Sequence, residues 1–323
     1  MNFSSPLQDW SPQAVYRCLD KEIMGQEKAK RAISVLFYNC LEGRRSTNLL
    51  MGSTGTGKTE LFRCLRRHYP GRVVVVDASA LSAEGWNGAN STHLSSILRN
   101  NPEIGKMPTL LVFDEFDKCI RPAYGSRGTN YADLLQDNFL KMADGDLVEF
   151  GEGSSFIQTD FFNVSIVFMG AFADLKVSAD GHRPVGFCPA PGVLPAASGQ
   201  EEISVDDLIQ YGLKRELAGR IQRLIRMEEL SFETMLQIAK KTVFHLSQEY
   251  NSSIWIDTPS LEQMAQAALD SGLGARFIRS CLLERMDAIQ FEDPSAAVYD
   301  IRREASDGPE YNVSGLPWEY EMA

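Results

Sequence analysis

Apolar and polar positions along the chain follow two periods, one typical of buried strands and one typical of helices. Continuous apolar runs predict strands at residues 48–51, 73–76, 110–113 and 164–169. Between these runs, apolar residues at spacings of three and four predict helices at residues 26–41, 59–68, 93–99 and 131–142. Strands that alternate with helices predict an α/β fold, with a parallel sheet flanked by helices on both faces.

The pattern changes near residue 231, which predicts a second domain. Residues 232–249 predict a long helix, residues 254–256 a short strand, and further helices end near residue 292. We therefore predict an N-terminal extension over residues 1–18, a large domain over 19–226 and a smaller, mainly helical lid domain over 227–323. Residues 177–204 form an irregular loop rich in proline and glycine, for which a functional role and disorder are the two alternatives.

Composition narrows the class of protein. The 323 residues are 44% hydrophobic and carry a net charge of -11, so we expect no nonspecific binding to nucleic acid. No apolar run approaches the roughly 18–20 residues of a membrane span, and we predict a cytoplasmic protein with no membrane partner. The cysteines lack a C-x-x-C pair and are predicted to be thiols of a reducing compartment rather than a zinc site. They are Cys18, Cys40, Cys64, Cys119, Cys188 and Cys281.

A glycine-rich segment after the first predicted strand carries the strongest signal. Its sequence G-S-T-G-T-G-K-T fits the phosphate-binding pattern G-x-x-x-x-G-K-T, between a strand and a helix. Glycines let backbone amides turn toward a polyphosphate, and the helix N-terminus favours negative charge. The segment therefore predicts ATP binding, with the lysine on the phosphates. The predicted nucleotide-binding residues here are Gly52, Ser53, Thr54, Gly55, Thr56, Gly57, Lys58, Thr59 and Glu60.

A second motif predicts that the nucleotide is hydrolysed. The apolar strand that begins at residue 109 ends in Asp114 and Glu115, and ligands collect at the carboxyl ends of parallel strands. We assign Thr59 and Asp114 to Mg²⁺ and Glu115 to polarising the attacking water. Without the phosphate-binding segment, a solvated acidic turn would be the better interpretation.

Three further segments, at residues 19–30, 207–220 and 274–276, resemble the AAA+ module of the Clp/Hsp100 unfoldases. The resemblance covers residues 19–298 and is closest to the ClpX subfamily, and we expect the zinc-binding N-terminal domain of that subfamily to be absent. It implies that Ile23 and Met24 line the adenine pocket. It also implies that Arg220 reaches a neighbouring subunit's nucleotide and that Arg276 touches the phosphates of its own subunit. Because Arg220 would act on a neighbouring subunit, the resemblance also implies a homo-oligomer, which we expect to be a hexameric ring.

The same resemblance predicts two contact loops. Gly85, Trp86, Asn87 and Gly88 occupy the place of the aromatic loop that grips polypeptide in the pore, although Trp86 packed under a loop is the alternative. Within the irregular loop, one tripeptide lies where this family has the loop that docks on a ClpP-like peptidase, and we predict the same role for it. The alternative is that so short a sequence arises by chance. The tripeptide consists of Val185, Gly186 and Phe187.

We therefore predict an ATP- and Mg²⁺-dependent protein unfoldase that threads protein substrates through a ring pore and feeds a ClpP-like peptidase. A remodelling ATPase without a peptidase is the nearest alternative. A nucleic-acid motor or loader is disfavoured by the net charge of -11 and by the aromatic loop.

Overall fold

The computed structural model describes residues 10–82, 92–124, 128, 130–151, 156–175 and 203–302, and the backbone of 310–312. The chain divides into two compact units. The first comprises Met1–Gly52 and Lys58–Met227, and the second comprises Ser53–Gly57 and Glu228–Ala323. Each unit has a hydrophobic core of its own.

A five-stranded parallel sheet forms the centre of the first unit, in the order β2-β3-β6-β1-β7. All four strands predicted before residue 226 are present in it, because strands buried on both faces show as continuous apolar runs. The predicted fold class is therefore confirmed. The strands are β1 (Thr47–Met51), β2 (Val73–Asp77), β3 (Thr109–Asp114), β6 (Val164–Gly170) and β7 (Arg223–Arg226).

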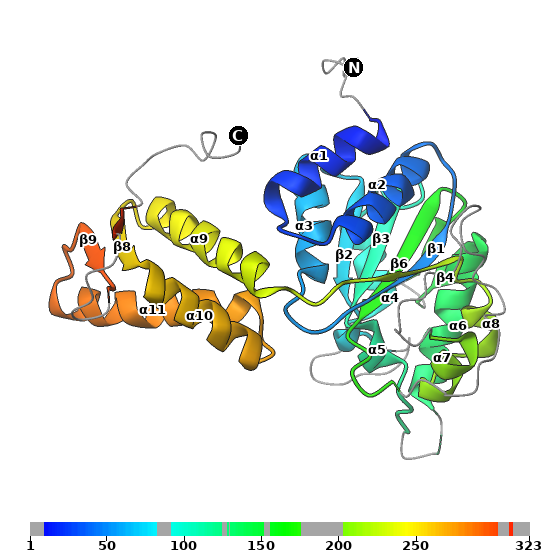
Figure 1. Cartoon of the computed structure of the whole chain (residues 1–323). Helices are drawn as coiled ribbons and strands as arrows, with labels where there is room; N and C mark the ends of the chain where they lie inside the picture. The colour runs from blue at the N-terminus through cyan, green and yellow to red at the C-terminus, as the bar shows by residue number, and fades with distance from the viewer. Residues whose placement is uncertain are drawn as a thin grey trace, which may run out of the picture. The chain divides into compact units, whose positions relative to one another are not determined.

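Helices cover both faces of this sheet (Figure 1). Successive side chains of a strand point to opposite faces, so Leu110 and Val112 of β3 pack with one set of helices, and Leu111 and Phe113 pack with the other. The first set consists of α1 (Pro12–Glu22), α2 (Glu27–Leu41) and α3 (Lys58–His68). The second set consists of α4 (Leu94–Asn100), α5 (Phe116–Cys119), α6 (Tyr131–Asp144), α7 (Val205–Tyr211) and α8 (Arg215–Ala218).

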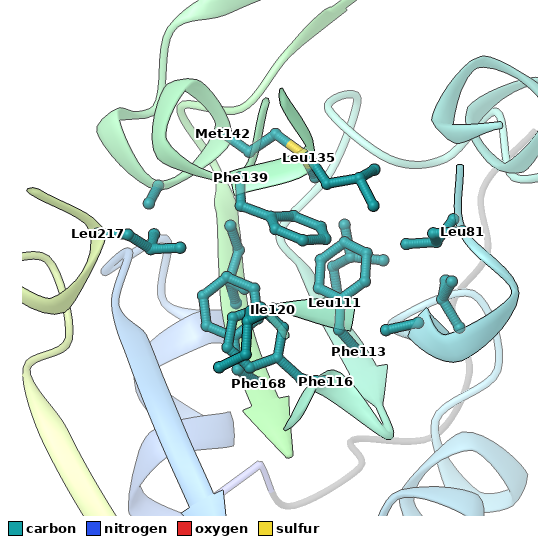
Figure 2. Packing of buried hydrophobic residues seen from close by; sticks show 14 of the residues in the cluster. Leu81, Leu111, Phe113, Phe116, Ile120, Leu135, Phe139, Met142, Phe168 and Leu217 are labelled. Carbon is teal, nitrogen blue, oxygen red and sulfur yellow. The ribbon is translucent and has the colours of Figure 1, made fainter. Parts of the chain in front are cut away.

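An aromatic cluster holds the second set of helices on the sheet (Figure 2). The ring of Phe116 stacks on Phe168 of β6 at 4.2 Å between centroids, and Phe113 meets Phe139 of α6 edge-on at 4.8 Å. All four side chains are fully buried. Such pairs add about 0.5–1.5 kcal/mol each beyond the burial of their apolar area, so the segment after β3 is firmly positioned.

The structure contains several elements that the hydrophobic pattern did not predict. Helix α1 begins at Pro12 behind the capping side chain of Ser11, so the boundary predicted between residues 18 and 19 falls inside a helix. Its buried residues are only Val15 and Leu19, too few to show a period. The unpredicted hairpin consists of β4 (Leu147–Phe150) and β5 (Ile157–Asp160).

The second unit packs three helices with a small sheet. The predicted helix over residues 232–249 is present with those bounds, and a sheet in the order β10-β8-β9 stands where one short strand was predicted. The elements are α9 (Phe232–Glu249), β8 (Ser253–Asp257), α10 (Thr258–Asp270), α11 (Ala275–Glu292), β9 (Val298–Asp300) and β10 (Glu310–Asn312). Across the described part of the chain, no helix has both the length and the apolar character needed to cross a membrane.

Candidate functional site

The phosphate-binding segment connects β1 to α3. Its backbone enters the left-handed region at Gly55, with φ of 83°, and at Gly57, with φ of 96°. Glycine adopts these angles without the steric cost that other residues incur. The Thr56 hydroxyl donates a hydrogen bond to the Ser53 carbonyl at 2.8 Å, and α3 begins at Lys58. The amides of the first turn of α3 have no acceptor within the helix and suit a phosphate.

Two predicted magnesium ligands lie side by side. The Thr59 hydroxyl, in the first turn of α3, donates a hydrogen bond to Asp114 Oδ2 at the end of β3, at 2.7 Å. Magnesium prefers carboxylate and hydroxyl oxygens and usually keeps several water ligands, so this pair fits a Mg²⁺ ion. The ammonium group of Lys58 donates a hydrogen bond to the Gly52 carbonyl. This bond keeps the ammonium group beside the phosphate-binding segment.

Glu115 follows Asp114 in a strained backbone conformation. Its φ is 56°, in the left-handed region, and its amide donates a hydrogen bond to Asp114 Oδ1 at 2.9 Å. Its carboxylate pairs with the Lys118 ammonium at 2.6 Å, and this hydrogen bond raises the pKa of Lys118. Both side chains are exposed, and exposed pairs contribute little free energy. The carboxylate can therefore leave Lys118 for a water molecule at small cost.

Asp117 is a residue that sequence reasoning missed. Its buried carboxylate accepts a hydrogen bond from the amide of Phe172 at 3.2 Å, just beyond the end of β6. It also fills the space beside Gly170, where a Cβ would lie 2.3 Å from Asp117 Oδ1. Asp117 thus links the acidic turn after β3 to the end of β6. The available signal was a third carboxylate two residues after Glu115.

The predicted adenine contacts lie in the tight turn between α1 and α2. Ile23 is buried and Met24 half-buried, and both Gly25 and Gln26 have left-handed backbone angles of 65° and 63°. The side chain of Lys30, on α2, donates a hydrogen bond to the Ile23 carbonyl at 3.3 Å. This contact holds the turn against α2.

Lys30 is itself buried, with 1% of its side chain exposed, and it pairs with Asp20 and with Glu27 at 2.7 Å. Although burial opposes the charge, the hydrogen bonds that the Lys30 ammonium donates to both carboxylates raise the pKa of Lys30. Two half-exposed carboxylates therefore keep a buried ammonium charged.

We expect Lys30→Met to destabilise the first unit by about 1–2 kcal/mol, below the 3–5 kcal/mol of a fully buried pair. The carboxylates of Asp20 and Glu27 remain half-exposed to water, and the buried ammonium disappears. Loss of the Ile23 contact should also weaken ATP binding. Urea denaturation and nucleotide titration test both effects. Lys28→Met, at an exposed position of the same helix, is the matched control, and equal losses in both variants would contradict the assignment.

The two predicted arginines are both exposed. Arg220 follows α8, with 47% of its side chain exposed, and it pairs with Asp144 at the end of α6. This hydrogen bond raises the pKa of Arg220. Arg276 is the second residue of α11 in the second unit, and its predicted contact with phosphate stays a prediction. The predicted pore loop, Gly85–Gly88, and docking loop, Val185–Phe187, lie outside the described residues.

Comparison with known proteins identifies the class of this site. Residues 48–171 match the family described as ATPase family associated with various cellular activities (AAA). This range holds the phosphate-binding segment and the acidic turn after β3. The protein therefore carries an AAA-family ATPase domain and hydrolyses ATP.

Similarity to particular relatives extends beyond that domain. The chain is 28% identical to the ATP-dependent Clp protease ATP-binding subunit ClpX of Treponema denticola, over 88% of this chain and 78% of that protein. It is 29% identical to ClpX 2 of Wolinella succinogenes, with the same coverage of both chains. The resemblance to ClpX-like AAA+ ATPases predicted from the motifs is thus confirmed.

Proposed function

We propose that the protein is an ATP-dependent unfoldase that threads polypeptides through the pore of a homo-oligomeric ring, expected to be a hexamer. The observation that carries this proposal is similarity to ClpX subunits along 88% of the chain, far beyond the ATPase core. The names of those relatives place them in an ATP-dependent protease. A cytoplasmic location stays a prediction.

The site residues suit distinct steps of ATP hydrolysis. Lys58 and the amides of the first turn of α3 would hold the phosphates, and Thr59 and Asp114 would hold Mg²⁺. When bound, Mg²⁺ neutralises charge on the β- and γ-phosphates. Glu115 orients water for attack on the γ-phosphate and accepts its proton. Asp117 positions this acidic turn against the end of β6 through the Phe172 amide.

The pore loop gives the direct test of the proposed function. We expect Trp86→Ala to retain ATP hydrolysis and to lose unfolding of a folded protein client, because an aromatic side chain between glycines grips polypeptide without taking part in chemistry. ATP turnover and the loss of fluorescence from a tightly folded client are measured on the same preparation.

Trp10→Ala is the matched control for this variant, because Trp10 packs edge-on against Tyr69 at 6.5 Å between ring centroids. It should affect stability and leave unfolding per ATP unchanged. If Trp86→Ala lowered the melting temperature and ATP hydrolysis together, Trp86 would belong to the core and the pore assignment would fail.

The second part of the proposal is that the protein associates with a ClpP-like peptidase. We expect Phe187→Ala to abolish association with a ClpP-like peptidase and to spare ATP hydrolysis, since one apolar anchor repeated around a ring adds weak contacts through avidity. Co-sedimentation with the peptidase measures this. Phe291→Ala, at a phenylalanine of α11 that is 84% exposed, is the control. Undiminished association of Phe187→Ala would favour a stand-alone remodelling ATPase.

A further inference from the structure

Helices α1 and α3 bring three different metal-binding side chains together at their contact. Helix α1 packs against α3 (Figure 1), and Glu22 is its last residue. Cys64 and His68 stand one turn apart on α3, so both side chains lie on the same face of that helix. A carboxylate oxygen, the thiol sulfur and an imidazole nitrogen all lie within 4.8 Å of one another.

The three side chains already contact each other and their surroundings. The imidazole Nε2 of His68 lies 2.7 Å from Glu22 Oε1. The thiol of Cys64 is fully buried and faces the Cys18 carbonyl at 3.6 Å. Arg67 pairs with Glu22 and also with Glu60, the latter at 2.8 Å. In this cluster the sulfur of Cys64 is therefore buried, and the imidazole of His68 is exposed to solvent.

We propose that Glu22, Cys64 and His68 form a binding site for a Zn²⁺ ion. Zinc takes nitrogen, sulfur and carboxylate ligands at about 2.0–2.3 Å in tetrahedral geometry, which requires donor atoms about 3.3–3.7 Å apart. The observed limit of 4.8 Å leaves only small side-chain rotations to reach that arrangement. With three protein ligands, water completes the coordination.

The charges balance around such an ion. Burial, followed by the charge of Glu22, raises the pKa of Cys64 to about 12, so the thiol keeps its proton until a cation replaces it. Zinc binding then releases that proton to solvent and leaves a thiolate and a carboxylate facing the two positive charges. Arg67 would be repelled by the ion, and Glu60 offers it a second partner at the surface.

The same burial argues against a reactive thiol as the role of Cys64. Reactive cysteines have lowered pKa values and are partly exposed, whereas Cys64 has neither property. A bound ion would instead join α1 to α3. Because Ile23 and Met24 follow Glu22 directly, the site would fix the helix that leads into the predicted adenine contacts.

Zinc binding is tested on the full chain, purified without a histidine tag and stripped with a chelator. Millimolar Mg²⁺ is kept present so that oxygen-rich sites are occupied. Calorimetric titration should give one Zn²⁺ per chain, and Co²⁺ in its place should show thiolate-to-metal charge-transfer absorption. We expect the melting temperature to rise with Zn²⁺, because the ion binds only the folded site.

Substitutions at the ligands decide the outcome. Cys64→Ser and His68→Gln should each weaken Zn²⁺ binding by about 100-fold or more and lose the zinc-dependent rise in melting temperature. Cys40→Ser removes another buried thiol, on α2, and should leave binding intact. His68→Gln changes a partly exposed side chain and keeps the test valid if Cys64→Ser fails to fold. Wild-type affinity equal to that of His68→Gln would overturn the proposal and leave only surface ion pairs.

Discussion

Glu115→Gln is expected to keep ATP bound and to lower its turnover by about 10²–10⁴-fold, the usual contribution of a general base. The amide preserves the shape of the side chain but cannot take a proton from water. Binding should survive because Lys58, Thr59 and Asp114 provide the phosphate and magnesium contacts, and Thr59 and Asp114 are already joined at 2.7 Å. Steady-state phosphate release and nucleotide titration separate the two effects.

Two comparison variants sharpen this result. Lys58→Ala should lose nucleotide binding itself, since it removes the ammonium group at the phosphates. Lys118→Met frees the Glu115 carboxylate from its exposed ion pair and should change turnover by no more than about fivefold, because such pairs contribute under about 1 kcal/mol. Turnover of Glu115→Gln within about twofold of wild type would refute the role given to Glu115.

The central sheet could be predicted because its strands are buried on both faces. The apolar runs in β1, β2, β3 and β6 are visible in any short window of sequence. Strand β7, at the edge of the sheet, reads Arg-Leu-Ile-Arg and has no such run. It pairs with β1 over four residues, so its strand conformation depends on a partner far away in sequence.

In the candidate site too, residues within a local motif could be predicted, and residues that depend on distant contacts could not. Lys58, Thr59 and Asp114 were predictable because each stands at a fixed position in a local motif. The buried ammonium of Lys30 and the carboxylate of Asp117 act on backbone groups of other segments, and no local pattern specifies such a contact. The sequence shows that Cys64 and His68 lie one helical turn apart, but only the packing of α1 on α3 adds Glu22.

We expect Arg220→Ala to lower ATP turnover by about 10³-fold or more, the contribution of an arginine finger. Its side chain is about half exposed, and among the described residues only the surface carboxylate of Asp144 pairs with it. The guanidinium group is therefore accessible to a neighbouring subunit. Stability should change by less than about 1 kcal/mol. Arg215→Ala, at a more exposed arginine of α8 that pairs with Asp206 at 3.5 Å, is the control and should retain turnover.

Mixing variants distinguishes action on a neighbour from action within one subunit. Arg220→Ala subunits keep an intact phosphate-binding segment, and Lys58→Ala subunits keep the arginine. In a mixed ring, some interfaces join the intact halves, so turnover should reappear although neither variant hydrolyses ATP alone. Dilution below the assembly concentration should remove it again, because separated subunits cannot share an arginine. Wild-type turnover per subunit that stays constant on dilution to monomers would contradict the ring, and Arg220 would then be a surface residue paired with Asp144.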